Sequence, residues 1–351
     1  MTDALPFVSV IILNYNGRSF LYGCLSSLSQ MNYPKSCYEV IMVDNGSVDG
    51  SVAYVEKNFP WVKILALSGN YGYTGGNNRG VNIAKGDLVV FLNNDTIVDK
   101  EWLRELVNVM HLDEEIAICG SKVILMDDPN HVQYSGGFLN LLGGTLFYPF
   151  HWQEPNSDFC LVGSICGASF LMRKVIFGMV GGFDEDFFMY SDENDLCLRV
   201  WVYGYRVAYA PRSVVYHFAG GSSPKCEGKF RLESLLGARL ISPLTIYHGN
   251  KNSIASIIKN FEFREALVGV IFSFFYCTLQ LLLLLKKADS KGIVLLSKAV
   301  FWPIKNFRKT WKKRLIIQKN RKLSDQKLIK ANLLIPISDM LRLIISWRLL
   351  N

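Results

Sequence analysis

The chain of 351 residues is half apolar, so it can bury the core of two domains, or of one large domain with an extension. Its net charge of +8 is uneven: residues 1–250 carry 18 Lys and Arg against 25 Asp and Glu, whereas residues 251–351 carry 20 against 5. Its eight cysteines form no Cys-x-x-Cys pair and lack histidines at zinc-finger spacing, which excludes a zinc finger and favours a reduced, intracellular protein. The N-terminus lacks the basic start of a secretory signal, so we expect the catalytic part to face the cytoplasm.

The N-terminal part alternates between apolar runs of strand length and amphipathic runs with helical spacing. Its expected elements are a strand at 8–13, a helix at 20–30, a strand at 38–43, a helix at 51–58 and a strand at 62–65. The first strand ends in Asn14-Tyr15-Asn16-Gly17, and the second ends in Asp44-Asn45-Gly46-Ser47. Strand and helix units of about 30 residues predict a parallel α/β sheet with right-handed crossovers, as in nucleotide-binding folds. Fold alone does not establish function.

A glycine-rich segment, residues 70–80, opens a helix that is expected to end near Gly86. Its glycines would let backbone amides approach phosphate groups at the helix N-terminus. The spacing matches neither the dinucleotide fingerprint Gly-x-Gly-x-x-Gly nor a Walker loop, because no Gly-Lys-Ser/Thr follows. A plain turn is the alternative interpretation of this segment.

The next strand, Val89 to Leu92, is apolar throughout and ends abruptly in Asn93, Asn94 and Asp95. Open α/β sheets bind their ligands at this carboxyl end of the strands. One carboxylate with two amides is able to hold a divalent cation and the phosphate oxygens that accompany it. The alternative is a turn without a ligand, since Asn and Asp are common turn residues.

Beyond this strand, a helix is expected at 101–110 and a strand at 116–124. Residues 127–162 are rich in glycine and aromatic residues and show no clear periodicity, so we expect an irregular stretch there. Long irregular stretches in compact domains tend to be functional. The aromatic residues within 147–152 would either stack on sugar rings or pack in the core.

Residues 184–195 contain six carboxylates interleaved with aromatic residues. We expect Asp192, Glu193 and Asp195 in the first turn of a helix, where the positive end of the helix dipole stabilises acids. Capping of that helix is one interpretation of the cluster. The other is catalysis, because the aromatic neighbours would partly desolvate the acids and raise the pKa of one toward that of a general base.

A short strand at 206–210 leads to the segment 214–218, which contains His217. A single histidine beside aromatic residues is usually structural. A metal-binding role is the competing interpretation, because Asp95 already suggests a cation site.

In this order, the segments Tyr15-Asn16, Asp44 to Ser47, Gly75 to Asn78, Asn93 to Asp95 and Asp192 to Asp195 resemble family 2 glycosyltransferases. The resemblance covers about residues 7–245 and is to the rhamnosyltransferase-like branch. It implies the GT-A fold, which is Rossmann-like, with a mostly parallel sheet and helices on both faces. Each motif is weak alone, whereas their ordered combination is specific.

The resemblance also implies which residues bind the nucleotide sugar. The Leu13 backbone and Tyr15 would line a pyrimidine pocket, in which Asp44 accepts the N3–H of uracil or thymine. Asn78, Asn94 and Asp95 would help to hold the rest of the donor.

The metal ligands implied by the resemblance are Asp95, which matches the last acid of the family's Asp-x-Asp motif, and His217. The cation, Mn²⁺ or Mg²⁺, would bridge the diphosphate and offset charge on the leaving nucleoside diphosphate. Glu193 matches the position of the base that deprotonates the acceptor hydroxyl and gives inversion at the anomeric carbon, and Asp192 is the alternative base. The sequence departs from the family at Asn93, which replaces the first acid of Asp-x-Asp and should weaken metal affinity. The usual Glu-Asp pair of the base motif also reads Asp192-Glu193 here.

The C-terminal region, residues 246–351, is expected to be a helical, basic extension of a transferase domain at 1–245. Its residues 266–285 carry no formal charge and are long enough for a transmembrane helix. Residues 286–330 then carry 15 basic side chains, which a single span would move across the membrane against the positive-inside tendency. We therefore favour attachment to an anionic membrane surface, with a single span and a soluble helical subdomain as alternatives.

The sequence thus predicts a metal-dependent, inverting glycosyltransferase at the cytoplasmic face of the cell membrane. It would move a rhamnose-like or other hexose from a dTDP- or UDP-linked donor to a hydroxyl of a lipid-linked glycan in cell-surface polysaccharide synthesis. A non-catalytic scaffold or sensor that binds nucleotide sugar is the alternative, since Asn93 replaces an acid. No nucleic-acid partner is expected, because the chain has no RNA- or DNA-binding motif.

Overall fold

The structure is a computed structural model that describes residues 5–147, 157–218, 242–340 and 342. The chain divides into two compact units. The first comprises Met1–Gly137, Phe147–Phe188 and Tyr205–Ala219, and the second comprises Phe138–Leu146, Met189–Gly204 and Gly220–Asn351. Two segments that the sequence analysis placed in the N-terminal domain, 138–146 and 189–204, therefore belong to the second unit by their contacts.

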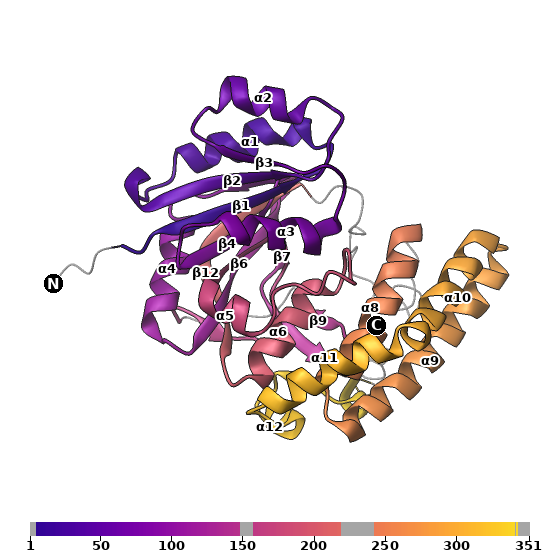
Figure 1. Ribbon diagram of the computed structural model, residues 1–351. Helices are drawn as coiled ribbons and strands as arrows, with labels where there is room; N and C mark the ends of the chain where they lie inside the picture. Colours follow the sequence, from indigo (N-terminus) through magenta and orange to yellow (C-terminus); the bar gives the residue numbers. More distant parts are fainter. Residues whose placement is uncertain (1–4, 148–156, 219–241, 341, 343–351) are drawn as a thin grey trace. The chain divides into compact units, whose positions relative to one another are not determined.

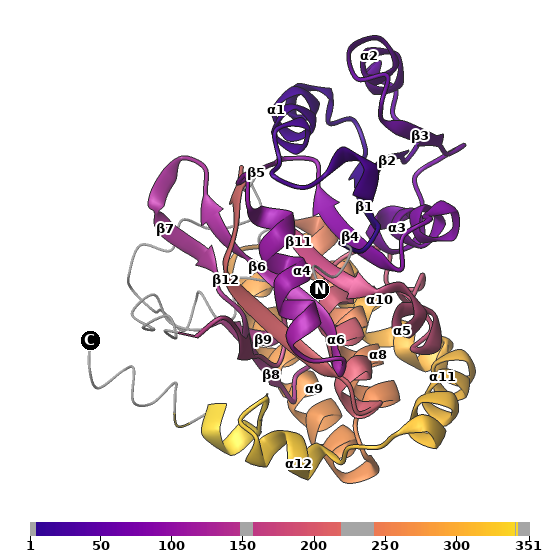
Figure 2. The same cartoon turned by 90° about the vertical axis from the view of Figure 1, so that its left-hand side faces the viewer.

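The first unit is built on a ten-stranded mixed sheet, in which the strands of the N-terminal part pair in parallel, as the sequence predicts. Across the sheet the strands are β10 (Cys160–Leu161), β12 (Arg206–His217), β6 (Ile116–Leu125), β11 (Ser169–Arg173), β4 (Leu88–Asn93), β1 (Val8–Asn14), β2 (Tyr38–Asp44) and β3 (Lys63–Ala66). The strands from β4 to β3 pair in parallel, and so do β12 and β6, whereas β11 is antiparallel to both of its neighbours. Two further strands pair beside this path, β5 (Thr96–Val98) with β12 and β7 (Asp128–Tyr134) with β6 (Figure 2).

Helices in this unit cover both faces of the sheet. They are α1 (Arg18–Ser29), α2 (Ser51–Asn58), α3 (Gly72–Ile83), α4 (Trp102–Leu112) and α5 (Lys174–Met179), and a short 3-10 turn, η1 (Lys35–Cys37), precedes β2. Figure 1 shows α1 and α2 on one side of β1 to β3 and α3 on the other. Side chains alternate along a strand, so Val10 and Ile12 of β1 join the core that includes α1 and α4, whereas Ile11 packs beneath α3. The helices and strands expected in residues 8–125 are confirmed.

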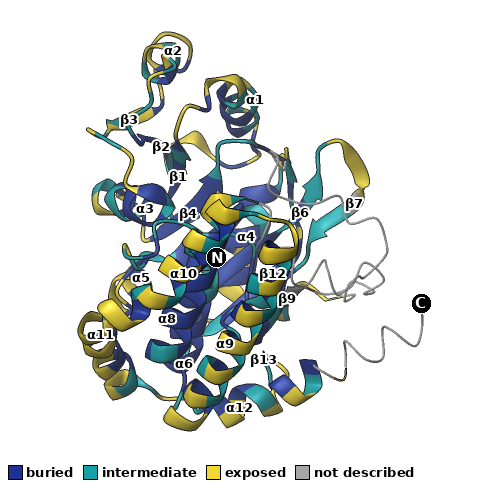
Figure 3. Cartoon of the chain, turned by 90° about the vertical axis from the view of Figure 1, so that its right-hand side faces the viewer, coloured by how far each residue is buried: buried dark blue, intermediate teal, exposed yellow. Residues whose placement is uncertain are grey.

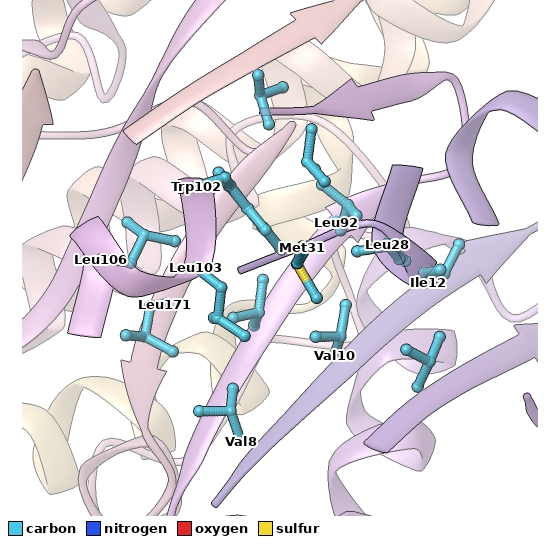
Figure 4. Packing of buried hydrophobic residues seen from close by; sticks show 14 of the residues in the cluster. Val8, Val10, Ile12, Leu28, Met31, Leu92, Trp102, Leu103, Leu106 and Leu171 are labelled. Carbon is cyan, nitrogen blue, oxygen red and sulfur yellow. The ribbon is translucent and has the colours of Figure 1, made fainter. Parts of the chain in front are cut away.

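A hydrophobic core cluster lies between α1, α4 and the sheet (Figure 4). Trp102 at the start of α4 is fully buried, and its indole Nε1 donates to the hydroxyls of Ser121 and Ser169 at 3.0 and 2.9 Å. A buried Trp N–H needs such a partner, because it would otherwise lose its bond to water. Around it, Leu103 and Leu106 pack with residues of β1, β4 and β11. The core thereby fixes α4 against the strands whose ends carry the polar residues.

Beyond residue 125, the local prediction was wrong for one segment. Residues 127–162, expected to be irregular, contain β7, β8 (Gly137–Asn140), β9 (Thr145–Phe147) and β10 in their described part. β8, β9 and β10 are too short for alternation to be recognised in the sequence, and β7 is mostly polar and contains a proline. The strand expected at 206–210 is present and continues to His217 as β12, whose register shifts between Ala210 and Val214. Residues 148–156 lie outside the described residues, so the sugar-stacking prediction for 147–152 stays a prediction.

The second unit is mainly helical, which confirms the helical nature of the C-terminal region. Its helices are α6 (Asp192–Val202), α8 (Asn250–Asn260), α9 (Phe263–Lys286), α10 (Ser290–Lys305), α11 (Phe307–Asn320) and α12 (Asp325–Lys330), and a π-helical turn, η2 (Thr245–Gly249), leads into α8. A small sheet of β13 (Leu334–Ile335), β8 and β9 belongs to the same unit. Helix α8 lies at its centre and packs against α6, α9, α10 and α11.

The close contact of α3 with the sheet gives a stability prediction. A Cβ atom at Gly80 would lie 2.7 Å from Ile11 Cγ2 and 2.9 Å from Val43 Cγ2, so Gly80→Ala is expected to cost about 1–3 kcal/mol through overpacking. Gly178→Ala is the matched control, because a Cβ there meets nothing within 4 Å. The measurement is urea unfolding of both variants. Equal midpoints for the two variants would contradict this account of how α3 packs.

Candidate active site

The carboxyl ends of three parallel strands meet at one edge of the sheet in the first unit. β1 lies between β2 and β4, and the register pairs Asn14 with Asp44 and Leu13 with Asn93. The polar residues that follow each strand are therefore neighbours, although they are distant in the sequence. Open α/β sheets bind ligands at this position.

The side chain of Asn14 connects the three strand ends. Its Nδ2 donates to Asp44 Oδ1 at 3.1 Å and to Ser47 Oγ at 3.2 Å, and its Oδ1 accepts from Asn94 Nδ2 at 2.8 Å. The backbone N–H of Ser47 donates to the second carboxylate oxygen of Asp44 at 2.9 Å. Asn14 and Asp44 are buried, so these bonds satisfy polar groups that water does not reach. A carboxylate offers about four acceptor positions, so Asp44 can accept a further bond from a ligand.

Gly17 makes room for this arrangement. A Cβ atom at this position would lie 2.1 Å from Asn94 Nδ2 and 2.8 Å from Asn14 Oδ1. Any side chain there would displace Asn94 from its bond. Gly17 also precedes the first residue of α1, so the loop turns from the end of β1 directly into a helix.

Asn45 fastens the glycine-rich segment to the end of β2. Its Nδ2 donates to Asn70 Oδ1 at 2.9 Å and to the carbonyl of Gly72 at 3.0 Å, and its Oδ1 accepts the backbone N–H of Tyr71 at 2.9 Å. Asn45 is buried, so the segment is held by a desolvated amide rather than by surface contacts. The N-terminal turn of α3 is thereby fixed next to Asp44, which precedes Asn45 in the chain.

Leu13 and Tyr15, the predicted pyrimidine-pocket residues, flank Asn14. The side chain of Leu13 packs against α3, where a Cβ atom on Gly76 would lie 2.3 Å from Leu13 Cδ1. Tyr15 is 51% exposed, so its ring is available to stack on a ligand. The position of both residues beside Asp44 is compatible with the predicted pocket, which stays a prediction.

Asn78 holds a segment of its own unit. Its Nδ2 donates to the carbonyl of Phe183 at 2.9 Å and to Glu185 Oε1 at 3.2 Å, and its Oδ1 accepts the N–H of Phe183 at 3.0 Å. Arg79 adds an ion pair to Glu185 at 3.4 Å. Asn78 therefore ties α3 to residues 183–185, and its predicted contact with the nucleotide stays a prediction.

Asp95 and His217, the predicted metal ligands, lie side by side. Nε2 of His217 is 3.2 Å from Asp95 Oδ1, because β5 pairs with the end of β12 and brings residue 217 beside 96. On its other side, His217 Nδ1 lies 3.0 Å from Gln133 Oε1 on β7. A proton on Nδ1 that is donated to Gln133 leaves the Nε2 lone pair facing Asp95, which is the tautomer that ligates a metal. Two ligands of one cation, with bonds of about 2.1 Å at right angles, are about 3 Å apart, so the pair fits a divalent cation.

The predicted base residues belong to the second unit. Asp192 is buried and Glu193 is partly exposed in the first turn of α6. Burial, and after it the charge of Glu193, raise the pKa of Asp192 well above its usual range, and burial raises the pKa of Glu193. The preceding residues Tyr190 and Ser191 have left-handed backbone angles, φ 70° and 58°, which side chains disfavour and which recur at functional sites.

Asp195 has a different role, because its carboxylate is fully buried inside the second unit. Its oxygens accept bonds from Arg199 Nε at 3.0 Å, Ser256 Oγ at 3.1 Å, Lys259 Nζ at 3.0 Å and Asn260 Nδ2 at 2.7 Å. Losing one partner of such a buried pair leaves an uncompensated charge. Asp195 therefore anchors α6 to α8, and it holds the turn that carries Asp192 and Glu193.

Another group of acids, Glu262, Glu265 and Asp325, places its oxygens within 4.8 Å of one another. Its geometry is explained by capping: Asp325 Oδ2 accepts the N–H of Glu262, and Glu262 Oε2 accepts the N–H of Asp325. Arg321 pairs with Asp325 at 3.0 Å, and Gln326 donates to Glu265 at 3.1 Å. These bonds join α9 to α12 without a cation.

The raised pKa of Asp192 predicts a pH-dependent gain in stability from Asp192→Asn. The folded state binds this proton more tightly than the unfolded state, so stability falls as pH rises from the usual Asp range through the raised pKa. The variant is expected to melt a few degrees higher than the parent at pH 8, since about 1 kcal/mol moves the Tm by about 2–4 °C, and near the parent at pH 4. The measurement is thermal unfolding at both pH values.

Asp49→Asn is the opposite-sign control for this experiment. Partial burial works against the charge of Asp49, but hydrogen bonds from the Ser51 hydroxyl and from the N–H groups of Arg18 and Ser51 outweigh it and lower its pKa. This variant is expected to lose stability above the usual Asp range and to match the parent below the lowered pKa. A lower Tm for Asp192→Asn at pH 8 would show that its charge is not costly in the folded state.

Comparisons with known proteins concern the family and the fold. Residues 9–180 match the family described as Glycosyl transferase family 2. The N-acetylglucosaminyl-diphospho-decaprenol L-rhamnosyltransferase of Mycobacterium tuberculosis is 29% identical over 249 residues, which cover 64% of this chain and 78% of that protein. The O-antigen biosynthesis protein RfbC of Myxococcus xanthus is 29% identical over 233 residues, which cover 62% of this chain and 18% of that protein. The chain spans between 18% and 37% of the length of the first three curated relatives that it matches.

A solved structure with a similar fold is the mannosyltransferase PcManGT of Pyrobaculum calidifontis in complex with GDP-Man and Mn²⁺. The two superpose with a TM-score of 0.53 over 91% of this chain and 86% of that chain, at 16% identity. This likeness concerns the fold, and it confirms the GT-A architecture that the motifs imply.

Proposed function

The chain belongs to glycosyl transferase family 2 through residues 9–180, and from this premise we propose that it transfers a sugar from a nucleoside diphosphate sugar to a hydroxyl of a lipid-linked glycan, with inversion. The observation that supports the proposal most is the joined set of strand ends, in which Asn14 bonds to both Asp44 and Asn94. Asp95 follows Asn94 directly, so base recognition and metal binding would share one edge of the sheet. Synthesis of a cell-surface polysaccharide at the cytoplasmic face of the membrane is part of this proposal.

The donor would be held by residues of the first unit. Asp44 has acceptor capacity for the N3–H of uracil or thymine, which favours a UDP- or dTDP-linked sugar, and the exposed ring of Tyr15 would stack on the base. Asp95 and His217 would hold Mn²⁺ or Mg²⁺, with Gln133 orienting the imidazole. When bound, the cation would offset the charge that develops on the leaving nucleoside diphosphate.

The second unit would supply the base that activates the acceptor hydroxyl. A general base at neutral pH needs a pKa above the usual carboxylate range, and burial raises the pKa of both Asp192 and Glu193. Glu193 is the more exposed of the two, which favours it as the group that reaches an acceptor. Asp192 is the alternative base. If Glu193 is the base, the charge of Asp192 would influence the pKa of Glu193.

The metal site gives the first test of the proposal. With UDP- or dTDP-sugar and Mn²⁺ at about 100 times the Kd, the free energy of unfolding should rise by about 2.7 kcal/mol, which is followed as a thermal shift. EDTA should remove this gain. Asp95→Ala should abolish this response, and Gln133→Ala should weaken metal affinity about 10–100-fold by releasing His217. Asp87→Ala is the matched control, because Asp87 is exposed and precedes the opposite end of β4. Unchanged shifts in Asp95→Ala would contradict the proposed metal site.

The base gives a second test and separates the enzyme from a scaffold. The scaffold is the alternative function, because Asn93 replaces an acid in the metal motif and its backbone carbonyl is already bonded to the Thr96 hydroxyl. If the protein is an enzyme, loss of its base should lower sugar transfer about 10²–10⁴-fold and leave donor binding intact. The variants are Glu193→Gln and Asp192→Asn, assayed by product formation and by donor-induced thermal shift. Transfer undiminished in both would refute the assignment of the base to α6, and no transfer by the parent with intact binding would favour the scaffold.

A further inference from the structure

Helix α9 has its large apolar residues on the outside and its small and polar residues on the inside. Its buried positions are Glu265, Ala266, Gly269, Ser273, Cys277, Gln280 and Leu284. Its exposed large apolar side chains, each at least 40% exposed, are Phe263, Leu267, Ile271, Phe274, Phe275, Leu282 and Leu285. Both sets recur at intervals of three and four residues over most of their length, so each occupies one stripe of the helix. Figure 3 shows exposed positions in yellow along α9, beside the dark blue of α8.

This arrangement is the reverse of the one found in helices of soluble proteins. In a soluble core helix the large apolar side chains turn inward, and most of the apolar stretch is buried, whereas only 28% of the apolar window of α9 is buried. Small residues on the inner stripe let the backbone approach closely: a Cβ atom on Gly269 would lie 2.5 Å from the Leu141 carbonyl and 2.9 Å from Ile257 Cγ2. Close packing through small residues, with large apolar side chains facing outward, is typical of helices that contact lipid.

The neighbouring helix α10 carries positive charge on its exposed side. α10 follows α9 after a short turn and packs against it. On its exposed side, Lys291, Lys298 and Lys305 recur every seven residues and form one edge, and Val294 and Phe301 lie next to them. Exposed apolar side chains are complementary to lipid chains, and the lysines next to them on α10 are complementary to anionic head groups.

We propose that the outer stripe of α9 and the adjoining side of α10 are embedded lengthwise in the surface of an anionic membrane. The attachment is in-plane, with both ends of α9 on the same side of the bilayer. The inference rests on the proposed membrane location, and it specifies the mode of attachment that the sequence left open between a surface helix and a span.

The packing of α8 argues against a span. The inner stripe of α9 lies against α8, whose Lys251 and Lys259 are buried and whose Lys259 pairs with Asp195 at 3.0 Å. A spanning α9 would carry these charged groups to the depth of the hydrocarbon, where they are costly. An in-plane α9 leaves α8 on the aqueous side and immerses only the side chains that the unit already exposes.

The test is flotation of the purified full chain with preformed, sealed vesicles of phosphatidylcholine, with or without 30% phosphatidylglycerol (roughly a physiological anionic content). The parent should float with the anionic vesicles. Ile271→Ser with Phe275→Ser should lower the bound fraction about tenfold, and Lys291→Gln with Lys298→Gln and Lys305→Gln should remove the preference for anionic lipid. Val175→Ser with Met179→Ser is the matched control, because these equally exposed apolar residues of α5 lie outside the surface and should leave binding unchanged.

The mode of attachment is tested with the variants Arg264→Cys and Lys287→Cys, which place a thiol at each end of α9. Each vesicle-bound variant is treated with a membrane-impermeant maleimide. Both new thiols should react without detergent, over the background of the parent. Reaction at one end only after detergent would overturn the in-plane mode in favour of a span. If Ile271→Ser with Phe275→Ser floats as well as the parent, the proposal that the outer stripe of α9 binds the membrane is overturned. It is also overturned if the parent is a dimer that this variant dissociates, because the stripe would then be a protein interface. Donor binding is measured on the same variants, so that failure of the proposed function can be told from failure of the membrane proposal. If no donor binds, the proposed function is contradicted, whereas the flotation result still stands.

Discussion

The hydrogen bonds of Asn14 are the constraint on which the polar edge of the sheet, at the ends of β1, β2 and β4, depends. Asn14 is fully buried at the end of β1, so its amide must find partners within the protein, and it finds Asp44 on one side and Asn94 on the other. This requires β4, β1 and β2 to be parallel neighbours in one register. A slip of one residue would turn Asn14 to the other face of the sheet and remove the bond that its amide donates to Asp44. The register of the sheet therefore determines the geometry of the site.

The loops around this edge are held by the same means. Asn45 fixes the glycine-rich segment, Gly17 leaves space for Asn94, and the pairing of β5 with β12 brings His217 to Asp95. Each of these contacts uses a buried amide, an absent side chain or a backbone ladder, none of which has much freedom to rearrange. The proposed donor- and metal-binding residues are thus already in place in the scaffold, which would reduce the ordering cost of binding.

The sequence predicts the α/β part of this structure well, because apolar runs that end in polar residues identify both the strands and their carboxyl ends. It also predicts that residues 44, 94 and 95 lie at one edge. It does not predict the bond between Gln133 and His217, because these residues are 84 positions apart and meet only through the pairing of β7, β6 and β12. Nor does it separate Asp195 from its neighbours Asp192 and Glu193: one helical turn contains two acids with raised pKa and one acid that is neutralised by partners from α8. The spacing of Asp195 and Arg199 at i and i+4 is the signal that could have indicated a structural pair.

The most direct test of the account is the position of a bound metal ion. Crystals of the protein grown with UDP and Mn²⁺ should show an anomalous peak at about 2.1 Å from a carboxylate oxygen of Asp95 and from Nε2 of His217. The account predicts that peak together with a pyrimidine ring whose N3–H reaches Asp44. A peak at Glu262, Glu265 and Asp325 instead, or a bound nucleotide with no metal beside Asp95, would contradict it.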